Sequence, residues 1–363
     1  MSLLTNASDK ALATYADNQR PWWQRLLLTR DAAVLALLVV VVFYSINQVP
    51  FFSNDITLYF LLLDLTPILL IALPMTLVII TGEIDLSVAS TVALTSVLFG
   101  VLHRDGLPIA LAAVLALVGA AICGAVNGLL VTKVGLPSLA VTIGTLALYR
   151  GIAVGLLGTT AITDWPDSWT SLAKDKIGTT MLPLVVIPIV VLVLAFAVLL
   201  HFTSFGRGVY AVGLSQEAAR FSGVNVDRTK LVLFTLSGLV SGLAGIYFTL
   251  RYGSARGDNA NGLELQVIAA VLLGGVSIFG GRGAIPGVLG GVFLIGVIAS
   301  ALRLDDYSAN VIQIITGVLL IVSVVAPSLV GWASRSRRRG PSAARRNLSE
   351  APTPTNAPNG SSK

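Results

Sequence analysis

Long apolar runs, each ended by charged or turn residues, recur along this 363-residue chain and restrict its fold more than any other feature. A helix needs about 20 largely apolar residues to cross the hydrocarbon core of a bilayer. Hydrophobic residues make up 55% of the chain and charged residues 12%, against about 45–50% and 25% in ordinary soluble domains. The composition therefore excludes a soluble globular protein and predicts an all-α polytopic membrane protein.

We expect about ten transmembrane helices. The first is cut short by Asn47 and Pro50, and Glu264 and Gln266 lie near the start of the eighth, so these two assignments are the weakest. The expected spans are residues 32–48, 58–80, 86–102, 107–131, 137–157, 181–201, 231–250, 263–280, 284–302 and 309–329.

Both ends of the chain are polar and basic, and the chain carries a formal net charge of +6. In a chain this apolar, a basic balance indicates membrane topology rather than nucleic-acid binding. The positive-inside rule places both termini in the cytoplasm, with most of the basic excess in the two tails. We assign residues 1–30 to a cytoplasmic N-terminal tail, 31–330 to the transmembrane domain and 331–363 to a disordered cytoplasmic tail.

The longest connecting segment, residues 202–230, is placed on the cytoplasmic side and contains a short predicted helix. Ser215 is suited to cap its first turn and Gly223 to end it. The small residues at its centre permit close approach to another protein; the alternative is a surface helix that only connects two spans. The helix is formed by Ser215, Gln216, Glu217, Ala218, Ala219 and Arg220.

A second motif, Gly82-Glu83-Ile84-Asp85-Leu86-Ser87, precedes the third apolar run. Asp85 lies where a helix begins, so its carboxylate can accept backbone N–H groups and interact favourably with the helix dipole. We interpret it as a structural cap. Arg282, in another tight turn on the inner side, is a candidate partner for Glu83 or Asp85.

Asp64 and Arg150 lie within apolar runs, where burying a charge is expensive and an ionisable residue is a functional candidate. Asp64 is roughly 9 Å and Arg150 roughly 11 Å inside the outer ends of their predicted helices. This similar depth leads us to expect that the two form a pair. The pair either lines the outward half of a pathway or only holds the bundle together.

Three uncharged polar residues, Asn127, Gln266 and Gln313, lie in or near the apolar runs. They could hydrogen-bond a hydroxylated substrate, although bonds between helices are the commoner use. Two His and one Cys are too few for a structural zinc site, which needs about four ligands. The glycine-rich stretch 274–283 lacks the Lys-Ser/Thr of a P-loop, so we expect this chain to bind no metal or cofactor itself.

Three separated motifs resemble those of permease subunits of bacterial ABC importers, in the monosaccharide branch that includes ribose, rhamnose and autoinducer-2 permeases. The resemblance extends over about residues 55–330, and its one clear departure is Glu83, where the family usually has a second glycine. The motifs are Ala72-Leu-Pro-Met-Thr-Leu-Val-Ile-Ile-Thr-Gly82 with the Glu83–Ser87 turn, Gln216-Glu-Ala-Ala-Arg-Phe-Ser-Gly223 after Phe205-Gly-Arg-Gly208, and Leu272-Leu-Gly-Gly-Val-Ser-Ile-Phe-Gly-Gly-Arg-Gly283.

The resemblance implies a transport subunit with no enzymatic activity of its own, located in the bacterial inner membrane. It makes 31–330 a permease domain whose cytoplasmic coupling loop, 202–230, docks through the predicted short helix on an ABC ATPase. That ATPase would bind ATP and Mg²⁺. The resemblance also implies an extracytoplasmic sugar-binding protein, a second permease subunit, and a monosaccharide or similar small polyol as substrate.

Two alternatives remain at this stage. One is a branched-chain amino-acid ABC permease of the same broad superfamily, whose zwitterionic substrate would need compensating charges in the pathway. The other is an ion-coupled secondary transporter, which needs no ATPase. In that case Asp64 is the best candidate for the coupling site within the membrane.

Overall fold

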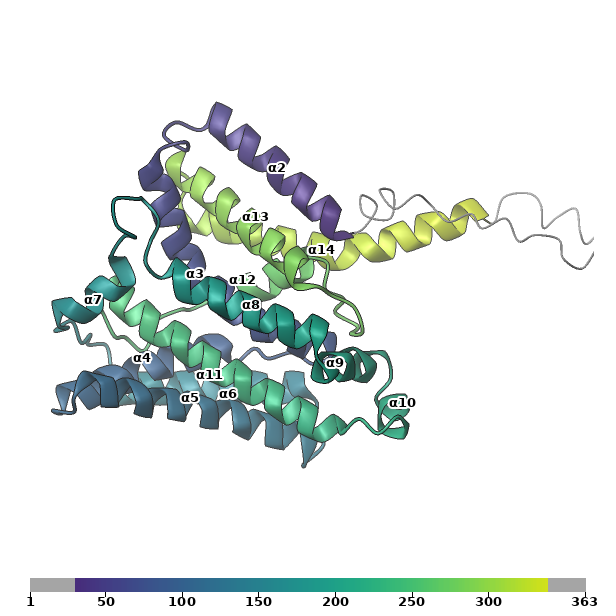
Figure 1. Cartoon of the computed structure of the whole chain (residues 1–363), viewed down its shortest axis with the longest axis horizontal. Coiled ribbons are helices and arrows are strands. Elements are labelled where there is room, and N and C mark those ends of the chain that lie inside the picture. Colours follow the sequence, from purple (N-terminus) through teal and green to yellow (C-terminus); the bar gives the residue numbers. More distant parts are fainter. Residues whose placement is uncertain (1–29, 339–363) are drawn as a thin grey trace, which may run out of the picture.

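The computed structural model describes residues 30–338, and within them the protein is helical apart from two isolated β-bridges (Figure 1). This confirms the predicted fold class. The helices are α2 (Arg30–Gln48), α3 (Asp55–Ile80), α4 (Val88–Arg104), α5 (Ile109–Thr132), α6 (Ser138–Leu157), α7 (Asp167–Lys174), α8 (Val186–Phe202), α9 (Ser204–Leu214), α10 (Gln216–Phe221), α11 (Val226–Tyr252), α12 (Leu263–Leu273), α13 (Ile285–Leu304) and α14 (Ala309–Arg338).

Among the described residues, five helices are long and apolar enough to cross a membrane, or six if α8 and α9 count as one bent span. The five are α3, α5, α6, α11 and α13, and the apolar parts of α2, α4, α12 and α14 are shorter. Each of the ten expected spans contains a helix, but the number that cross the membrane stays a prediction. The tails fall mostly outside the described residues, and α14 continues past residue 330 into the segment predicted to be disordered.

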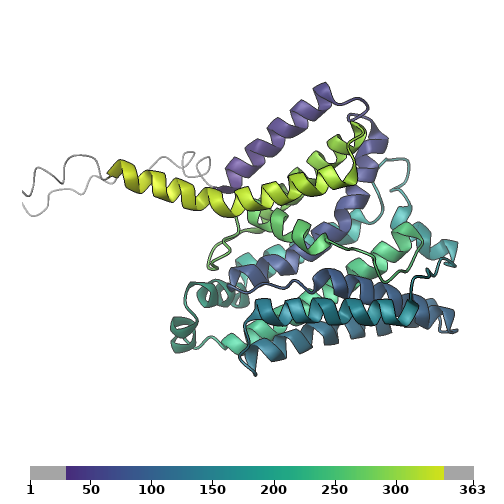
Figure 2. The ribbon, with the colours of Figure 1, turned by 180° about the vertical axis from the view of Figure 1, so that it is seen from behind.

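Helices α3 and α11 form the centre of the bundle. Every residue from Leu65 to Ile80 in α3 is buried, as expected for a helix that is apolar all round. α11 packs on α3, α4 and α5, whereas α13 packs on α2, α3 and α12. Figures 1 and 2 show α4, α5, α6 and α11 on one side of the molecule and α2, α13 and α14 on the other.

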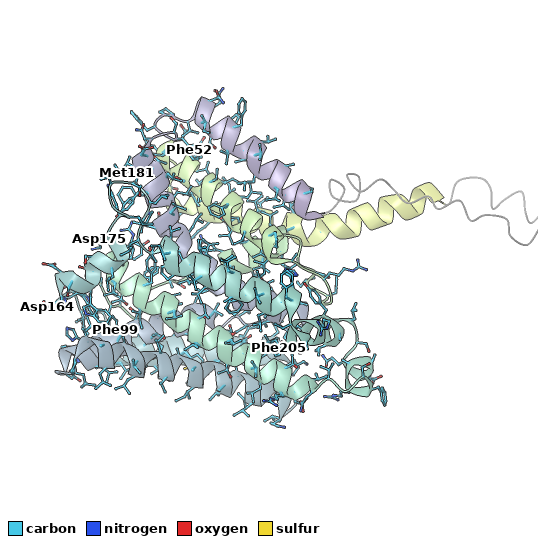
Figure 3. The ribbon with its side chains drawn as sticks, viewed as in Figure 1. Phe52, Phe99, Asp164, Asp175, Met181 and Phe205 are labelled. Atoms are coloured by element: carbon cyan, nitrogen blue, oxygen red, sulfur yellow. The ribbon has the colours of Figure 1, made fainter. Side chains whose placement is uncertain are left out.

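Two ends of the bundle can be distinguished by the short helices that they carry. Helix α7 lies at one end, where Asp164, Asp175 and Met181 also lie, and α9 and α10 lie at the other end, near Phe205 (Figure 3). We call these the α7 end and the α10 end. The predicted connecting segment 202–230 therefore lies at the α10 end, opposite α7.

The closest helix packing joins α5 to α11 through glycines. A Cβ atom on Gly238 would lie 2.8 Å from the Cα of Gly124, and one on Gly128 would lie 3.1 Å from the Cα of Leu231. Small residues at such a crossing let two backbones come close together in a membrane. These glycines therefore pack within one subunit.

The segment predicted as a coupling loop is more helical than expected. Helix α9 follows α8 at an angle of 66°. The bend lies at Thr203, whose Oγ1 accepts a hydrogen bond from the N–H of Gly206 at 3.1 Å and so caps α9. Two glycines of this stretch, Gly206 and Gly213, lie where another backbone approaches closely.

The eighth predicted span is wrong as a continuous helix. Helix α12 ends at Leu273, after 11 residues, and the chain continues to Ala284 without regular helix. Gly275 has φ of 92°, a left-handed conformation that ends the helix at little cost only because the residue has no Cβ. Gly274 lies against Gly287 and Val288 of α13, where a Cβ would meet backbone atoms.

Candidate functional site

The predicted short helix at the α10 end is present. It is α10, and the Oγ of Ser215 accepts a hydrogen bond from the N–H of Ala218 at 3.3 Å, which confirms the cap. Gly223 follows the helix with φ of 82°, as its predicted role at the end of the helix requires. Ala219 is buried against Val212 and Val226, so it anchors α10 to its own subunit rather than facing a partner.

The remaining surface of α10 faces outward. The side chains of Gln216, Glu217 and Ala218 are exposed, and Arg220 forms an exposed ion pair with Asp227 at 3.1 Å. Phe221 is 93% exposed, which is unusual for a phenyl ring and makes it available to a partner. Exposed Leu214 and Phe279 lie at the same end of the molecule, and Leu214 packs beside Gly281.

Hydrogen bonds connect α9 to the centre of the bundle. The Tyr210 hydroxyl donates to the carbonyl oxygen of Gly283 at 2.7 Å, and the N–H of Gly281 donates to the carbonyl oxygen of Ile80 at 2.8 Å. Ile80 is the last residue of α3. Helix α9, the turn before α13 and the end of α3 therefore form one connected unit next to α10.

The turn between α3 and α4 is closed by Asp85, which is 1% exposed. Its Oδ1 accepts hydrogen bonds from the N–H of Ser87 at 3.0 Å and from the hydroxyl of Ser87 at 2.7 Å. This agrees with the predicted cap. Its Oδ2 accepts a further hydrogen bond from Ser237 of α11 at 2.7 Å, a contact that the sequence did not indicate.

The depth of this turn differs from the sequence interpretation. Ser237 lies about 16 Å along α11 from its first residue, near the middle of the 27-residue helix. The turn therefore reaches into the interior of the bundle. Asn127 of α5 adds a hydrogen bond from its side-chain N–H to the Ser87 hydroxyl at 2.8 Å.

Arg282 is not the partner of either carboxylate in the turn. Glu83 forms an ion pair with Lys230 of α11 at 2.5 Å, and both side chains are largely buried. Arg282 is exposed on the turn before α13. The residue that replaces the usual second glycine of the family therefore binds the turn to α11.

The predicted pair of Asp64 and Arg150 does not form. Asp64 Oδ2 accepts from Arg303 at 2.7 Å, and its Oδ1 lies 3.7 Å from Arg251. Similar depth does not make two residues neighbours in a bundle of this size. Arg251 and Arg303 escaped the prediction because each lies just beyond the end of an expected span.

Arg150 instead holds the segment 253–262 between α11 and α12. Its guanidinium donates to the carbonyl oxygens of Gly257 at 2.9 Å and Asn259 at 2.6 Å. The side-chain N–H of Asn259 donates to Ser96 at 3.0 Å. A half-buried cation that is satisfied by backbone carbonyls has a structural role in this geometry.

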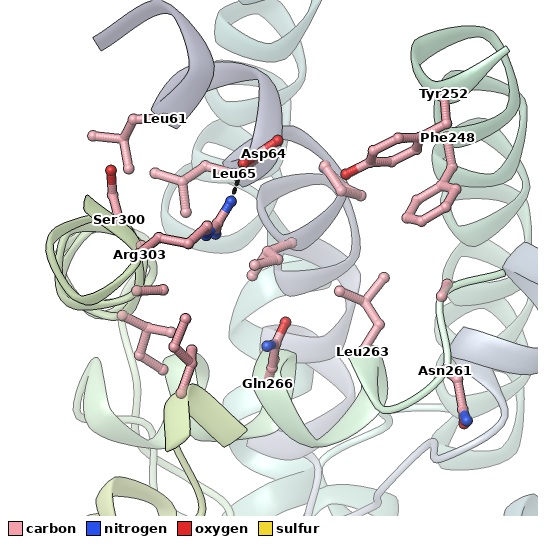
Figure 4. Close-up of a pocket in the computed structure, with 17 residues that line it drawn as sticks. Leu61, Asp64, Leu65, Phe248, Tyr252, Asn261, Leu263, Gln266, Ser300 and Arg303 are labelled. Atoms are coloured by element: carbon pink, nitrogen blue, oxygen red, sulfur yellow. Dashed lines mark hydrogen bonds and ion pairs between the residues drawn. The ribbon is translucent and has the colours of Figure 1, made fainter. Parts of the chain in front are cut away.

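A cavity of about 280 Å³ lies between α3, α11, α12 and α13 (Figure 4). Gln266, one of the three predicted polar contacts, lines it, whereas Asn127 is fully buried elsewhere and Gln313 is exposed on α14. Figure 4 shows the Asp64–Arg303 pair on one wall and Phe248 and Tyr252 on another. Its polar lining consists of Asp64, Asn261, Gln266, Ser300 and Arg303.

Two further cavities adjoin this one. The first, of about 530 Å³, shares Asp64, Ser300 and Arg303 with it. The second, of about 420 Å³, shares Phe248 and Tyr252 with it. Within the part of the chain that the structure describes, no group of three His, Cys, Asp or Glu side chains could hold a metal ion.

These features define the class of the protein: a helical, membrane-embedded permease with a polar cavity and an exposed helix at one end. Residues 57–324 match the family described as branched-chain amino acid transport system, permease component. The chain belongs to this permease family. It is therefore a multi-pass protein of the inner membrane and a transport subunit.

Relatives in this family resemble the chain over most of its length. The autoinducer 2 import system permease protein LsrD of Escherichia coli O157:H7 is 36% identical over 308 residues, which cover 82% of this chain and 92% of the relative. LsrD of Klebsiella pneumoniae is 35% identical over 84% of this chain and 93% of the relative. LsrD of Yersinia enterocolitica is 35% identical over 72% and 80%, respectively.

These relatives confirm the resemblance that the three motifs indicated, and they do not favour an ion-coupled transporter. The chain is a permease of the ABC importer type. No solved structure matches it significantly.

Proposed function

We propose that the chain moves a monosaccharide or a similar small polyol into the cell as the permease subunit of an ATP-driven importer. The observation that carries the proposal is α10, a capped helix that projects between α9 and α11 with Glu217, Arg220 and Phe221 exposed. The relatives named above are permeases of autoinducer 2 import systems, which supports a small hydroxylated substrate.

In this mechanism the α10 end faces the cytoplasm and α10 docks on a separate ATPase subunit that binds ATP and Mg²⁺. An extracytoplasmic binding protein delivers the substrate to the α7 end, and a second permease subunit, identical or homologous, completes the pathway. The ATPase switches the access of the cavity only if it binds one conformation of the permease more tightly than the other. The contacts of α9 with the end of α3 connect the neighbourhood of α10 to the centre of the bundle. The preference of the ATPase for one conformation can therefore act on the helices around the cavity.

The family description names branched-chain amino acids, so a permease for these is the second candidate. Both candidates share the ATPase and the docking helix. They differ in the substrate that is imported, and a transport assay separates them.

The test is gentle purification of the tagged chain from its native membrane, followed by identification of the proteins that accompany it. We expect an ATPase subunit to accompany the wild type and to be lost from Glu217→Lys, which reverses an exposed charge on α10. Gly223→Val should have the same effect, because valine is strained at φ of 82°. Arg104→Gln, which alters an exposed pair at the end of α4, is the matched control.

Purification of the wild-type chain without an ATPase, together with uptake driven by a proton or sodium gradient, would overturn the proposal. Uptake of labelled leucine and not of labelled autoinducer 2 or ribose would leave the importer mechanism and replace its substrate.

A further inference from the structure

We infer that the cavity between α3, α11, α12 and α13 is a binding site for the transported molecule, with Asp64 accepting hydrogen bonds from hydroxyl groups of a polyol. The inference rests on the proposed function and deepens it, because it names the site and the substrate contacts. The cavity volume of about 280 Å³ lies near the lower end of ligand pockets, which span about 300–1,000 Å³. Its size therefore suits a small molecule of monosaccharide dimensions.

The lining of the cavity has the chemistry that a polyol needs. Gln266 and Ser300 offer uncharged hydrogen-bonding groups from α12 and α13. Phe248 and Tyr252 lie with their ring centroids 4.5 Å apart and form an aromatic wall opposite them, with the Tyr252 hydroxyl directed toward Asp64 (Figure 4). A polar wall that faces an aromatic wall can bind the hydroxyl groups and the C–H face of a sugar at the same time.

Asp64 retains hydrogen-bonding capacity for a ligand. An ionised carboxylate can accept about four hydrogen bonds. Its Oδ2 accepts from Arg303 at 2.7 Å, whereas Arg251 lies 3.7 Å from Oδ1, beyond hydrogen-bond distance. The Asp64 side chain is 26% exposed, so a ligand in the cavity can reach it.

The side chains of the two arginines beside Asp64 differ in how freely they can move. The side chain of Arg251 is 16% exposed and lies over the rings of Phe60 and Tyr252, at 5.6 Å and 5.5 Å from their centroids. The side chain of Arg303 is 56% exposed. Arg251 is therefore the more enclosed of the two cations, and Arg303 is the one whose side chain has room to move when a ligand enters.

The position of the Asp64–Arg303 ion pair supports a role in controlling the passage of a ligand between two cavities. Asp64, Ser300 and Arg303 line both the central cavity and the neighbouring cavity of about 530 Å³. A ligand that passes between the two cavities would meet this pair. Exchange of the Asp64–Arg303 bond for bonds to ligand hydroxyls would open the passage while Asp64 keeps Arg251 as its neighbouring cation at 3.7 Å.

The amino-acid alternative fits this lining less well. A zwitterion could use Asp64 for its ammonium group and Arg303 for its carboxylate. A branched aliphatic side chain could pack on Leu65, Ile68 and Ile295, but it would leave Gln266 and Ser300 without hydrogen bonds to the ligand, which costs affinity. The uncharged polar groups therefore favour a polyol.

The experiment uses cells that express the complete importer with wild-type or variant permease and measures uptake of labelled autoinducer 2, D-ribose and L-leucine. We expect Asp64→Asn and Gln266→Ala each to lower the maximal polyol uptake about tenfold, with little change in the half-saturating concentration, which the external binding protein would set. Arg104→Gln, outside the cavity, should leave uptake unchanged.

A second measurement reports binding directly. The imported polyol, at millimolar concentration, should raise the melting temperature of the purified wild-type permease, and the shift should disappear in Asp64→Asn and Gln266→Ala. A purely structural role of these residues would instead lower the melting temperature measured without ligand. If Asp64→Asn does not accumulate in the membrane, Gln266→Ala and Ser300→Ala decide the question.

The outcomes separate the inference from the proposed function. If the wild type imports a polyol with ATP and all cavity variants match it in uptake and thermal shift, the cavity is not the binding site and the proposed function stands. If the wild type imports no polyol in an ATP-dependent manner, both fall. If leucine alone is imported and produces the thermal shift, the site is retained and its polyol assignment is wrong.

Discussion

Asp64 and Asp85 are two carboxylates in the same helical bundle, and their surroundings differ. Asp85 is 1% exposed and accepts hydrogen bonds from two hydroxyl groups and a backbone N–H of its own bundle. Asp64 is 26% exposed, contacts two arginines and lines a cavity. A carboxylate that its own fold satisfies with neutral donors holds helices together, whereas one that borders a cavity with a movable cation is available to a ligand.

Replacement of Asp85 should have the largest effect on the stability of the fold. Asp85→Ala leaves three buried donors on Ser87 and Ser237 without their acceptor, and each such group costs about 1–3 kcal/mol. We expect the free energy of unfolding to fall by about 3–5 kcal/mol, measured by thermal melting in detergent and by the amount of chain in the membrane. Asp64→Ala, the matched control, should lower it by about 1 kcal/mol or less. Equal losses in both variants would remove the distinction between the two carboxylates.

Breaking the ion pair of Glu83 and Lys230 should cause the second largest loss of stability. Lys230→Met leaves a largely buried carboxylate without its cation, which costs about 3 kcal/mol for a pair that is not completely enclosed. The double variant Glu83→Gln/Lys230→Met removes both charges and should recover at least half of that loss. A double-mutant cycle on melting measures the coupling; additive losses would show that the pair contributes nothing to stability.

Replacement of Arg150 should have an intermediate effect on stability, and the effect should be local to one segment. Arg150→Gln removes the charged hydrogen bonds to the carbonyl oxygens of Gly257 and Asn259. One hydrogen bond to a charged group contributes about 1.5–3 kcal/mol, and because Arg150 is only half-buried we take about that amount for the two together. We expect a destabilisation of about 2 kcal/mol and faster hydrogen exchange confined to residues 253–262. Protection that is lost equally throughout α11 would contradict a local role for Arg150.

The exposed pair of Arg256 and Asp258 should have the smallest effect. Hydrogen bonds from Arg256 hold the pKa of Asp258 below its usual range. The pair therefore stabilises the fold above the ordinary pKa of aspartate, and this contribution is lost as the pH falls through the lower folded-state value. Because both side chains are largely exposed, Arg256→Gln should melt within error of the wild type at pH 7. A clear destabilisation would mean that even exposed charges contribute to stability at this end of the molecule. That result would weaken the contrast between Asp64 and Asp85.

The helices could be predicted from the sequence because apolar runs of bilayer length are a local property. The eighth span was wrong, since the helix stops where Gly274 meets Gly287 of α13 and that contact is not visible from the local pattern. Local contacts at the two motifs were predicted well. Ser215 caps α10 three residues away, and Asp85 binds Ser87 two residues away.

Partners distant in the sequence could not be predicted. Ser237 lies 152 positions from Asp85, and Arg303 lies 239 positions from Asp64. Depth in the membrane constrains one coordinate of a residue, and its neighbours depend on the order of helices around the bundle. The expected contact between Asp64 and Arg150 failed for this reason, and the cavity that Asp64 lines became visible only in three dimensions.

The 66° bend between α8 and α9 has a mechanical consequence. Helix α9 has 11 residues and is about 16 Å long, so any rotation about Thr203 would act over that length. A rotation of about 10° at Thr203 would displace the far end of α9, next to Ser215, by about 3 Å. A small rotation at Thr203 would thus produce an ångström-scale movement of α10, and the length of α9 sets the ratio between the two.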